Sequence, residues 1–505
     1  MEEATILELQ LKMASGEFTA QMLAEYYLNR IETLDQSGPS INSVIELNPD
    51  ALPIARKRDD ERAAGKVRSP LHGIPVLVKD NIDTRDHMQT TAGSLALEGS
   101  FARRDAYIVK RLRASGAVIL GKANLSEWAN FRGKRSISGW SSRGGLTINP
   151  YVLDRSACGS SSGSAAAVSA NLCAASIGTE TDGSIICPSQ TCSVVGLKPT
   201  LGLLSRSGII PVANSQDTAG PIGRTVEDVA ILLGALVGVD ERDRSTRLKR
   251  RRAFRNYTQF LTKEGLKGAR VGVARNMLGS DDRVTCIFET CLEIMKQMGA
   301  VVIDPANLPN NDTFGETELE VLLYEFKYGL NSYLSSLGPR SPVHSLEEVI
   351  KFNEENKDRV MPFFGQERMI AANEKGSLSS KKYRDALSRN RRLTRREGID
   401  DLLKRKRLDA VVVASGGPAW LIDLVNGDPR SWDMESTSPA AVAGYPHITV
   451  PAGYLFGLPI GISFFSKAWN ESTLLKIAYS FEQAMMARKP PEFLPNVDLL
   501  IGQYD

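Results

Sequence analysis

The sequence predicts an α/β protein of three layers, in which a large mixed, mostly parallel β-sheet is covered by helices on both faces. Two observations carry this prediction. Short runs of β-branched and other apolar residues recur along the chain, and segments with helical periodicity separate them. The runs are also continuous rather than alternating with polar residues, which is typical of strands in a sheet buried on both sides.

Seven segments have the composition of buried strands: residues 73–80, 117–120, 270–273, 301–303, 411–413, 447–450 and 459–463. The first of them carries Lys79 near its end. Thr5 and Glu8 form a T-x-x-E capping box, which predicts a helix start. Further helices are expected over residues 105–114 and 124–131 and along the apolar stripe of residues 284–298.

We expect a single domain over residues 1–505. Its segment of about 306–407 differs from the rest because it is mostly charged and helical, with few strand signals. This segment is predicted to be a helical excursion over the edge of the sheet.

The composition excludes several classes of partner. Hydrophobic residues make up 42% of the 505 residues and charged residues 24%, and the formal net charge is only +3. This bias gives no argument for nucleic acid or an anionic membrane, and the local basic run 249–252 is interpreted as a solvated loop. We find no signal peptide and no apolar run near the ~18 residues of a membrane span. Six scattered cysteines do not suggest a disulfide scaffold, so we expect a cytoplasmic protein.

The most unusual segment is the serine- and glycine-rich stretch 158–167, which runs into a helix of small residues. The helix indicates that this loop is held in place rather than free, unlike a flexible linker. Its residues 159–163 match the G-x-S-x-G pattern of α/β-hydrolases, which would make Ser161 the nucleophile. That pattern requires a histidine base downstream. Only His344 and His447 follow, neither in a recognisable triad context, so this alternative is disfavoured.

Several motifs in order give the chain a specific resemblance. They are Gly73-Ile-Pro-Val-Leu-Val-Lys-Asp80, Gly159-Ser-Ser-Ser-Gly-Ser-Ala-Ala-Ala167, Thr181-Asp-Gly-Ser-Ile185, Val195-Gly-Leu-Lys-Pro-Thr200, Gln216-Asp-Thr-Ala-Gly-Pro221 and Leu458-Pro-Ile-Gly-Ile-Ser463. Together they cover nearly the whole chain, which resembles the amidase signature family and is closest to its peptide amidase branch. The resemblance implies the fold of that family, with residues of about 70–230 as its catalytic core.

The resemblance also implies a catalytic triad. In it Ser184 is the nucleophile, Ser160 is a bridging serine whose preceding peptide bond is cis, and Lys79 is the base. The turn before Ser184 is expected to supply backbone N–H groups to an oxyanion hole, those of Thr181, Asp182, Gly183 and Ser184. Supporting roles are assigned to Gly159, Ser161 and Asp182.

A lysine suits this chemistry only if it is neutral. A serine hydroxyl needs a base to take its proton, and burial can lower the lysine pKa by several units from its ordinary value of about 10.4. Lys79 has the setting for this because it lies at the end of an apolar strand.

The resemblance implies hydrolysis of a small-molecule or peptide C-terminal amide through an acyl-enzyme, with no cofactor and no metal. The expected partner is the amide substrate alone, and the chain is expected to be a monomer or homodimer. The excursion of about 306–407 would help to shape the substrate pocket. Weak candidates for substrate contact, each equally explained by packing, are Tyr324, Phe364, Gln366 and Trp420.

Three alternatives stay open. The chain could be the glutaminase subunit of a tRNA-dependent amidotransferase, which shares the serine–serine–lysine core but works with partner chains. It could be a catalytically inactive binding module on the same fold, although Lys79, Ser160 and Ser184 are all present. Cysteine or metal chemistry at Cys187 and Cys192 or at 286 and 291 is disfavoured. Neither pair has C-x-x-C spacing, and such cysteines are expected to be small buried hydrophobes.

Overall fold

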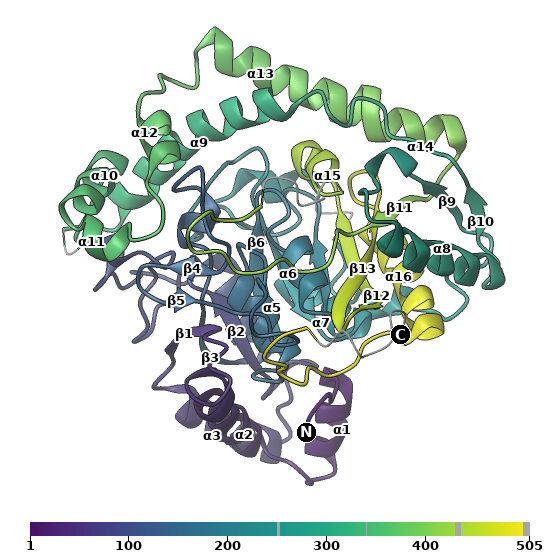
Figure 1. The fold of residues 1–505 in the computed structure, drawn as a ribbon. Coiled ribbons are helices and arrows are strands. Elements are labelled where there is room, and N and C mark those ends of the chain that lie inside the picture. The colour runs from purple at the N-terminus through teal and green to yellow at the C-terminus, as the bar shows by residue number, and fades with distance from the viewer. Residues whose placement is uncertain (250–252, 340, 430–435, 498–505) are drawn as a thin grey trace.

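A single large sheet forms the centre of the computed structural model, which describes residues 1–249, 253–339, 341–429 and 436–497 (Figure 1). From one edge to the other its strands are β1 (Val44–Leu47), β3 (Val118–Ala123), β2 (Pro75–Lys79), β6 (Ala175–Glu180), β8 (Thr218–Gly223), β7 (Val195–Lys198), β12 (His447–Leu455), β13 (Leu458–Phe465), β11 (Ala410–Ala414), β9 (Arg270–Val273) and β10 (Val301–Ile303). A separate short hairpin consists of β4 (Trp140–Ser141) and β5 (Gly145–Leu146).

The sheet is mixed, as predicted. Parallel pairs lie toward its two ends, β3–β2 and β2–β6 in one half and β11–β9 and β9–β10 in the other. The other six pairs of this sheet in the described part of the chain are antiparallel. This antiparallel share is larger than the alternation of strands and helices led us to expect, because β8, β7, β12 and β13 are antiparallel neighbours through the centre.

Helices cover both faces of the sheet. The atoms that pack against three glycines of the neighbouring strands β6 and β8 show this. A Cβ on Gly178 would meet Ser161 at the start of α5 (Ser162–Ser169), and one on its cross-strand partner Gly220 would meet Ile185 beside α6 (Ile186–Thr191). A Cβ on Gly223 would instead meet Asp228 and Val229 of α7 (Val226–Leu236). Because side chains alternate along a strand, Gly220 and Gly223 face opposite sides.

The remaining helices outside the excursion have the bounds α1 (Ile6–Ala14), α2 (Ala20–Arg30), α3 (Ala51–Ala63), α4 (Tyr107–Ser115), α8 (Asp282–Gln297), α15 (Ser438–Ala443) and α16 (Glu471–Met485). The first begins with the predicted capping box, in which Thr5 and Glu8 each accept from the other's backbone N–H. Residues 124–131 are not the predicted helix: they contain only a 3₁₀ turn, Glu127–Asn130, because Trp128 and Ala129 have left-handed backbone angles.

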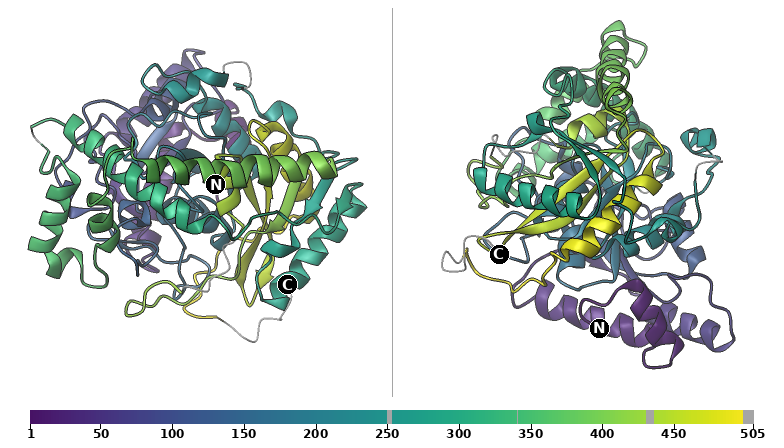
Figure 2. Two further views of the ribbon diagram at one scale, coloured as in Figure 1. Left: turned by 90° about the horizontal axis from the view of Figure 1, so that it is seen from above. Right: turned by 90° about the vertical axis from the view of Figure 1, so that its right-hand side faces the viewer.

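The segment 306–407 consists of helices joined by loops in its described part. Its helices are α9 (Gly315–Ser336), α10 (Leu346–Glu355), α11 (Lys357–Val360), α12 (Glu367–Asn373), α13 (Lys381–Arg391) and α14 (Asp400–Lys406). Seen from above, α13 and α14 form one long rod with the π-helical turns Arg392–Ile399, and this rod crosses the molecule beside α9 (Figure 2).

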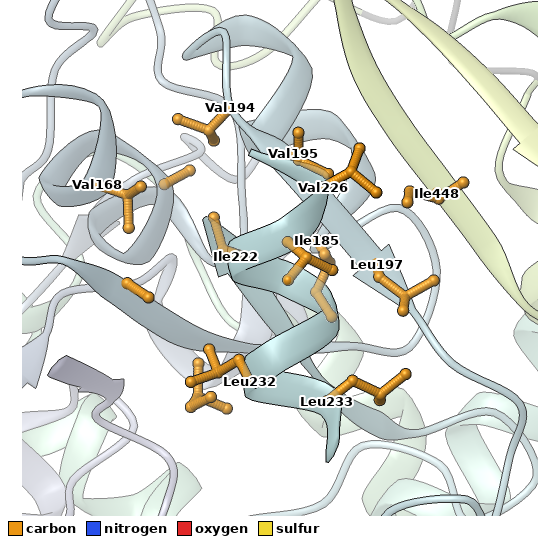
Figure 3. Packing of buried hydrophobic residues seen from close by; sticks show 14 of the residues in the cluster. Val168, Ile185, Val194, Val195, Leu197, Ile222, Val226, Leu232, Leu233 and Ile448 are labelled. Atoms are coloured by element: carbon orange, nitrogen blue, oxygen red, sulfur yellow. The ribbon is translucent and has the colours of Figure 1, made fainter. Parts of the chain in front are cut away.

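The core lies between the sheet and the helices on its two faces (Figure 3). Val168 of α5, Leu197 of β7, Ile222 of β8 and Leu233 of α7 are all fully buried in one apolar cluster. Burying an apolar side chain of this size is worth about 1.5–3 kcal/mol. The loops that join these elements therefore start from a rigid, close-packed interior.

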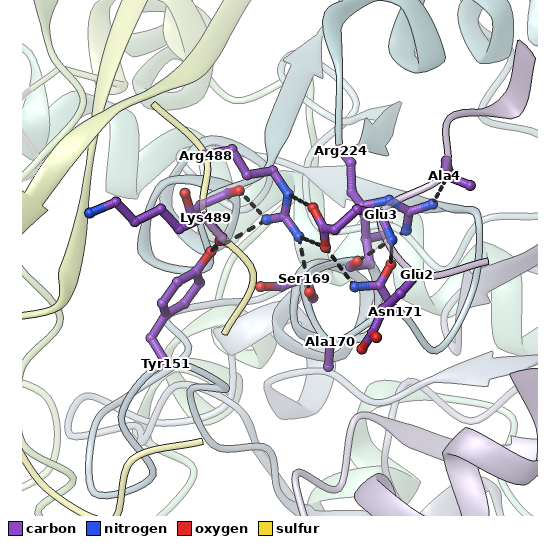
Figure 4. Close-up of polar contacts among 12 residues, drawn as sticks. Glu2, Glu3, Ala4, Tyr151, Ser169, Ala170, Asn171, Arg224, Arg488 and Lys489 are labelled. Atoms are coloured by element: carbon purple, nitrogen blue, oxygen red, sulfur yellow. Dashed lines mark hydrogen bonds and ion pairs between the residues drawn. The ribbon is translucent and has the colours of Figure 1, made fainter. Parts of the chain in front are cut away.

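Polar contacts tie both ends of the chain to the last turn of α5 (Figure 4). The guanidinium of Arg488 donates to both carboxylate oxygens of Glu3 at 2.8 Å and to the carbonyl of Ser169 at 3.1 Å. Asn171 donates to the same carboxylate at 2.6 Å. This network fixes the C-terminal end of the helix whose N-terminal end carries the serine-rich loop.

All seven predicted strands are present, but β1, β6, β7 and β8 of the large sheet and the hairpin strands β4 and β5 were not predicted. The reason is clearest for β8, whose sequence Thr-Ala-Gly-Pro-Ile-Gly contains residues that disfavour strands. Residues 250–252 of the basic run lie outside the described part of the chain, so its interpretation as a solvated loop stays a prediction.

Candidate active site

Lys79 is the last residue of β2, and its side chain is completely buried. Its amine nitrogen lies 2.8 Å from Ser160 Oγ, 3.0 Å from Ser161 Oγ and 3.0 Å from Thr179 Oγ1. Burial lowers the pKa of Lys79 to about 7, although the negative charges of Glu180 and Asp217 act in the opposite direction. Half of the molecules therefore carry a neutral amine at this position near pH 7.

Ser160 faces this amine from the serine-rich loop. The peptide bond between Gly159 and Ser160 is cis, as the resemblance implied. The carbonyl of Ser160 accepts from the Ser126 N–H at 3.1 Å, and Gly159 packs so closely on Ser126 that a Cβ would lie 2.2 Å from its hydroxyl. Glycine at position 159 is thus required by the close approach of the two loops.

Ser161 follows Ser160 in the same loop. Its hydroxyl donates to the carbonyl of Thr179 at 3.0 Å and accepts from the N–H of the same residue at 3.2 Å. The side chain of Ser161 is fully buried. His447 lies on β12, and neither of its ring nitrogens has a hydrogen-bond partner in the described structure. This arrangement is typical of a residue that supports the loop, and it offers no histidine base for the α/β-hydrolase alternative.

Ser184 follows a tight turn between β6 and α6. Gly183 has a φ of 74°, a left-handed conformation that favours glycine. The carbonyl of Ser184 accepts from the Ser161 N–H at 3.1 Å, so the two serine loops are joined through their backbones. Ser184 is 7% exposed, and its hydroxyl has no hydrogen bond to Ser160 or to any other described residue. The predicted relay from Ser184 to Ser160 is therefore not joined by a hydrogen bond between the described residues of this structure.

The turn presents its backbone N–H groups without acceptors. Among the described residues, the N–H groups of positions 181–184 have no hydrogen-bond partner, whereas those of Ile185 and Ile186 donate to the buried carboxylate of Glu180 at 2.6 and 3.1 Å. Glu180 holds the start of α6 in place by these two bonds. The preceding N–H groups are left free for an anionic ligand atom.

The side chain of Asp182 is hydrogen-bonded to the start of α15. Its two carboxylate oxygens accept from Thr437 Oγ1 at 2.7 Å and from Ser438 Oγ at 2.6 Å. These bonds tie the turn to α15, and the supporting role of Asp182 in catalysis stays a prediction. Gln216 adds a second tie, because its amide donates to the carbonyl of Thr181 at 3.3 Å.

A disulfide between Cys158 and Cys187 joins the two serine loops, and it was missed by the sequence analysis. Cys187 was expected to be a small buried hydrophobe, but its position on α6 brings it to the start of the serine-rich loop. The Cα atoms of the pair are 5.9 Å apart. Cys192 and Cys291 are buried and free, as expected, and Cys173 is buried and free as well. The expectation was wrong for Cys286, which is exposed because it lies on the face of α8 opposite the buried stripe of this helix.

The four weak candidates for substrate contact lie in different surroundings. Tyr324 packs on Tyr383 between α9 and α13, and Gln366 bonds to α10 through the carbonyl of Ile350. Phe364 stacks edge-on against Trp140. Trp420 donates to the Asp428 carboxylate at 3.1 Å. Trp420 also lies beside the start of the serine-rich loop, because its carbonyl accepts from the Ser156 N–H at 2.9 Å. The contacts named for the other three do not reach the serine loops.

A cavity of about 520 Å³ borders Thr179, Glu180 and Thr181, the residues that lead into the turn before Ser184. Its walls include Thr179 and Asn81. The side-chain amide nitrogen of Asn81 donates to the hydroxyl of Thr179 at 3.0 Å, and its side-chain oxygen, Oδ1, is buried without a partner in the described structure. Thr179 and Glu180 were not predicted as site residues. Their position directly before the turn at 181–184 is the only sequence signal that could have identified them.

No group of three or more histidine, cysteine, aspartate or glutamate side chains placed to hold a metal ion occurs in the part of the chain that the structure describes. Over the same residues, no helix is both long enough and apolar enough to cross a membrane.

Comparisons with known proteins place this geometry in context. A family model described as Amidase matches residues 22–475. A probable amidase of Arabidopsis thaliana is 43% identical over 504 residues, which cover 98% of this chain and 92% of that one. The structure of the peptide amidase PAM in complex with the competitive inhibitor chymostatin has a TM-score of 0.94 at 49% identity, covering 97% of this chain and 99% of that one. A glutamyl-tRNA(Gln) amidotransferase subunit of Symbiobacterium thermophilum is 34% identical, covering 93% of this chain and 94% of that one.

Proposed function

Since the chain belongs to the amidase family and is a hydrolase of amide carbon–nitrogen bonds, we propose that it cleaves small-molecule or peptide C-terminal amides with Lys79, Ser160 and Ser184. The observation that supports this most is the buried amine of Lys79, 2.8 Å from the Ser160 hydroxyl and without an ion-pair partner in the described structure. Burying a lysine in this way is costly unless its neutral form is used.

In the proposed mechanism, neutral Lys79 accepts the proton of the Ser160 hydroxyl, and Ser160 accepts the proton of Ser184. The oxygen of Ser184 then attacks the carbonyl carbon of the amide. The negative charge that develops on the carbonyl oxygen is stabilised by the free N–H groups of residues 181–184. The proton returns through Ser160 to the leaving nitrogen, which departs as ammonia or an amine.

The acyl-enzyme on Ser184 is hydrolysed by the same groups. Water takes the place of the amine, donates a proton through Ser160 to Lys79, and attacks the ester carbon. The proton then returns through Ser160 to the oxygen of Ser184 as its bond to the acyl carbon breaks, and the carboxylic acid leaves. Gly183 allows the backbone to approach the substrate closely in both half-reactions because it has no side chain.

Peptide C-terminal amides are the proposed substrate class because of the likeness to peptide amidase over 97% of this chain. The second candidate is the glutaminase subunit of an amidotransferase, which the 34% identity to the amidotransferase subunit of Symbiobacterium thermophilum favours. The test is turnover by the purified chain alone on a panel of peptide amides, anilides, fatty amides and glutamine. Turnover of peptide amides supports the hydrolase, whereas activity on glutamine that needs partner chains supports the second candidate.

Two matched variants test the assignment of the nucleophile. We expect Ser184→Ala to abolish turnover in a folded protein. If Ser161 were the nucleophile, Ser161→Ala would abolish turnover and Ser184→Ala would retain it. If both variants kept the activity of the wild type, neither Ser184 nor Ser161 could be the nucleophile.

The assembly and location of the chain stay predictions. We propose that it acts as a monomer or homodimer, without nucleic acid, and its cytoplasmic location stays an expectation from the sequence. The Cys158–Cys187 disulfide argues against the cytoplasm, since disulfides persist mainly in oxidising compartments. Counting free thiols in protein isolated under alkylating conditions tests this point.

A further inference from the structure

A carboxyl group of the helical excursion reaches the turn that precedes Ser184. Glu318 lies in the first turn of α9, is only 8% exposed, and contacts the Asp182 carboxyl group through a hydrogen bond. Two carboxyl groups can share such a bond only if one of them carries a proton. Asp182 already accepts from two hydroxyls of residues 437 and 438.

Gln216 closes a second path between the same two elements. Its amide nitrogen donates to Glu318 Oε1 at 2.8 Å and to the carbonyl of Thr181 at 3.3 Å. It is 2% exposed. The excursion helix is thus bonded to the turn once through a side chain, Asp182, and once through a backbone carbonyl, that of Thr181.

We propose that Glu318, in its protonated form, is a positioning residue that holds the turn 181–184 in the conformation that binds the oxyanion, by donating a hydrogen bond to Asp182 and accepting one from Gln216. This inference rests on the proposed function. It concerns a residue that does not touch the substrate and acts through Asp182.

The surroundings favour the protonated form of Glu318. Burial and the neighbouring charge of Asp182 raise the pKa of Glu318 well above its ordinary range. Arg368 of α12 is the cation that faces the pair, and it acts in the opposite direction. Asp182 also interacts electrostatically with Glu180 and Lys198. When Glu318 loses its proton as the pH rises, two adjacent carboxylates repel each other, and the turn is expected to move.

The test compares three variants on one peptide amide, with kcat and KM measured from pH 6 to 10. In Glu318→Gln the amide can still accept from Gln216 and donate to Asp182, but it cannot ionise. We expect wild-type kcat within about threefold at pH 7.5, and no loss of kcat on the alkaline side, where the wild type declines. In Glu318→Ala we expect kcat to fall about tenfold or more with a smaller change in KM, because oxyanion stabilisation is lost.

Glu316→Ala is the matched control, since Glu316 is exposed in the same helical turn and has no ion pair among the described residues. It is expected to match the wild type at every pH. The proposal is overturned if Glu318→Gln keeps the wild-type alkaline decline, or if Glu318→Ala keeps wild-type kcat while folded by circular dichroism. An inactive wild type would instead contradict the proposed function, so the two failures are distinguishable.

Discussion

The pH dependence of catalysis gives a quantitative test of Lys79 as the base. The perturbation is a decrease in pH, which protonates the amine and removes the acceptor for the Ser160 proton. Burial lowers the pKa of Lys79 from 10.5 to about 7. An amine with this pKa is about 90% neutral at pH 8 and about 1% neutral at pH 5, so kcat/KM is expected to fall about 90-fold between these values.

The assay is hydrolysis of a peptide amide followed by chromatography of the acid product, in buffers of constant ionic strength. On the acid side, the logarithm of kcat/KM should rise with a slope of about one and level off near pH 7. A lysine with its ordinary pKa would instead make kcat/KM increase about tenfold per pH unit up to pH 10. A continued increase of that kind would refute the assignment of a neutral Lys79.

Three further predictions follow from the packing and charges around the site. Lys79→Met should abolish turnover and raise the free energy of unfolding at pH 7 by on the order of 1–4 kcal/mol, because the lysine must lose its proton to be buried. The cost of losing this proton decreases as the pH rises from about 7 to 10.5, so denaturant unfolding at two pH values measures it. Gly178→Ala would place a Cβ 2.8 Å from Ser161 Oγ, so we expect about 1–3 kcal/mol lower stability and a lower kcat. Thermal unfolding and turnover measure the two effects, and unchanged values of both would contradict the close contact between Gly178 and Ser161. Arg488→Met removes the ion pair of the Glu3 carboxylate and should lower stability by roughly 1–3 kcal/mol with kcat unchanged, so a loss of kcat in the folded variant would show that these contacts do more than stabilise.

Much of the site could be predicted from the sequence because its key residues lie in short contiguous motifs. Lys79 ends an apolar strand, and the serine-rich loop precedes a helix of small residues, so local patterns alone were enough to locate both. The seven apolar strands were found for the same reason. In contrast, β8 was missed because its glycines and proline are tolerated only by the close packing around them.

Contacts between distant segments could not be predicted. Cys158 and Cys187 are 29 residues apart, and nothing in their spacing distinguishes a bonded pair from two buried thiols. Glu318 belongs to a segment that was predicted only as a charged helical excursion, yet its side chain meets the turn at Asp182. Such pairings depend on how α9 lies over the sheet, which local periodicity does not determine.

The central claim is that Lys79 activates Ser184. Its most direct test is the mapping of a fluorophosphonate adduct by peptide mass spectrometry, with the labelling rate measured at pH 6 and pH 8. We predict an adduct on Ser184, a rate about tenfold higher at pH 8 because the amine has a pKa of about 7, and no labelling of Lys79→Met. An adduct on Ser161, or labelling of Lys79→Met at the wild-type rate, would contradict the claim.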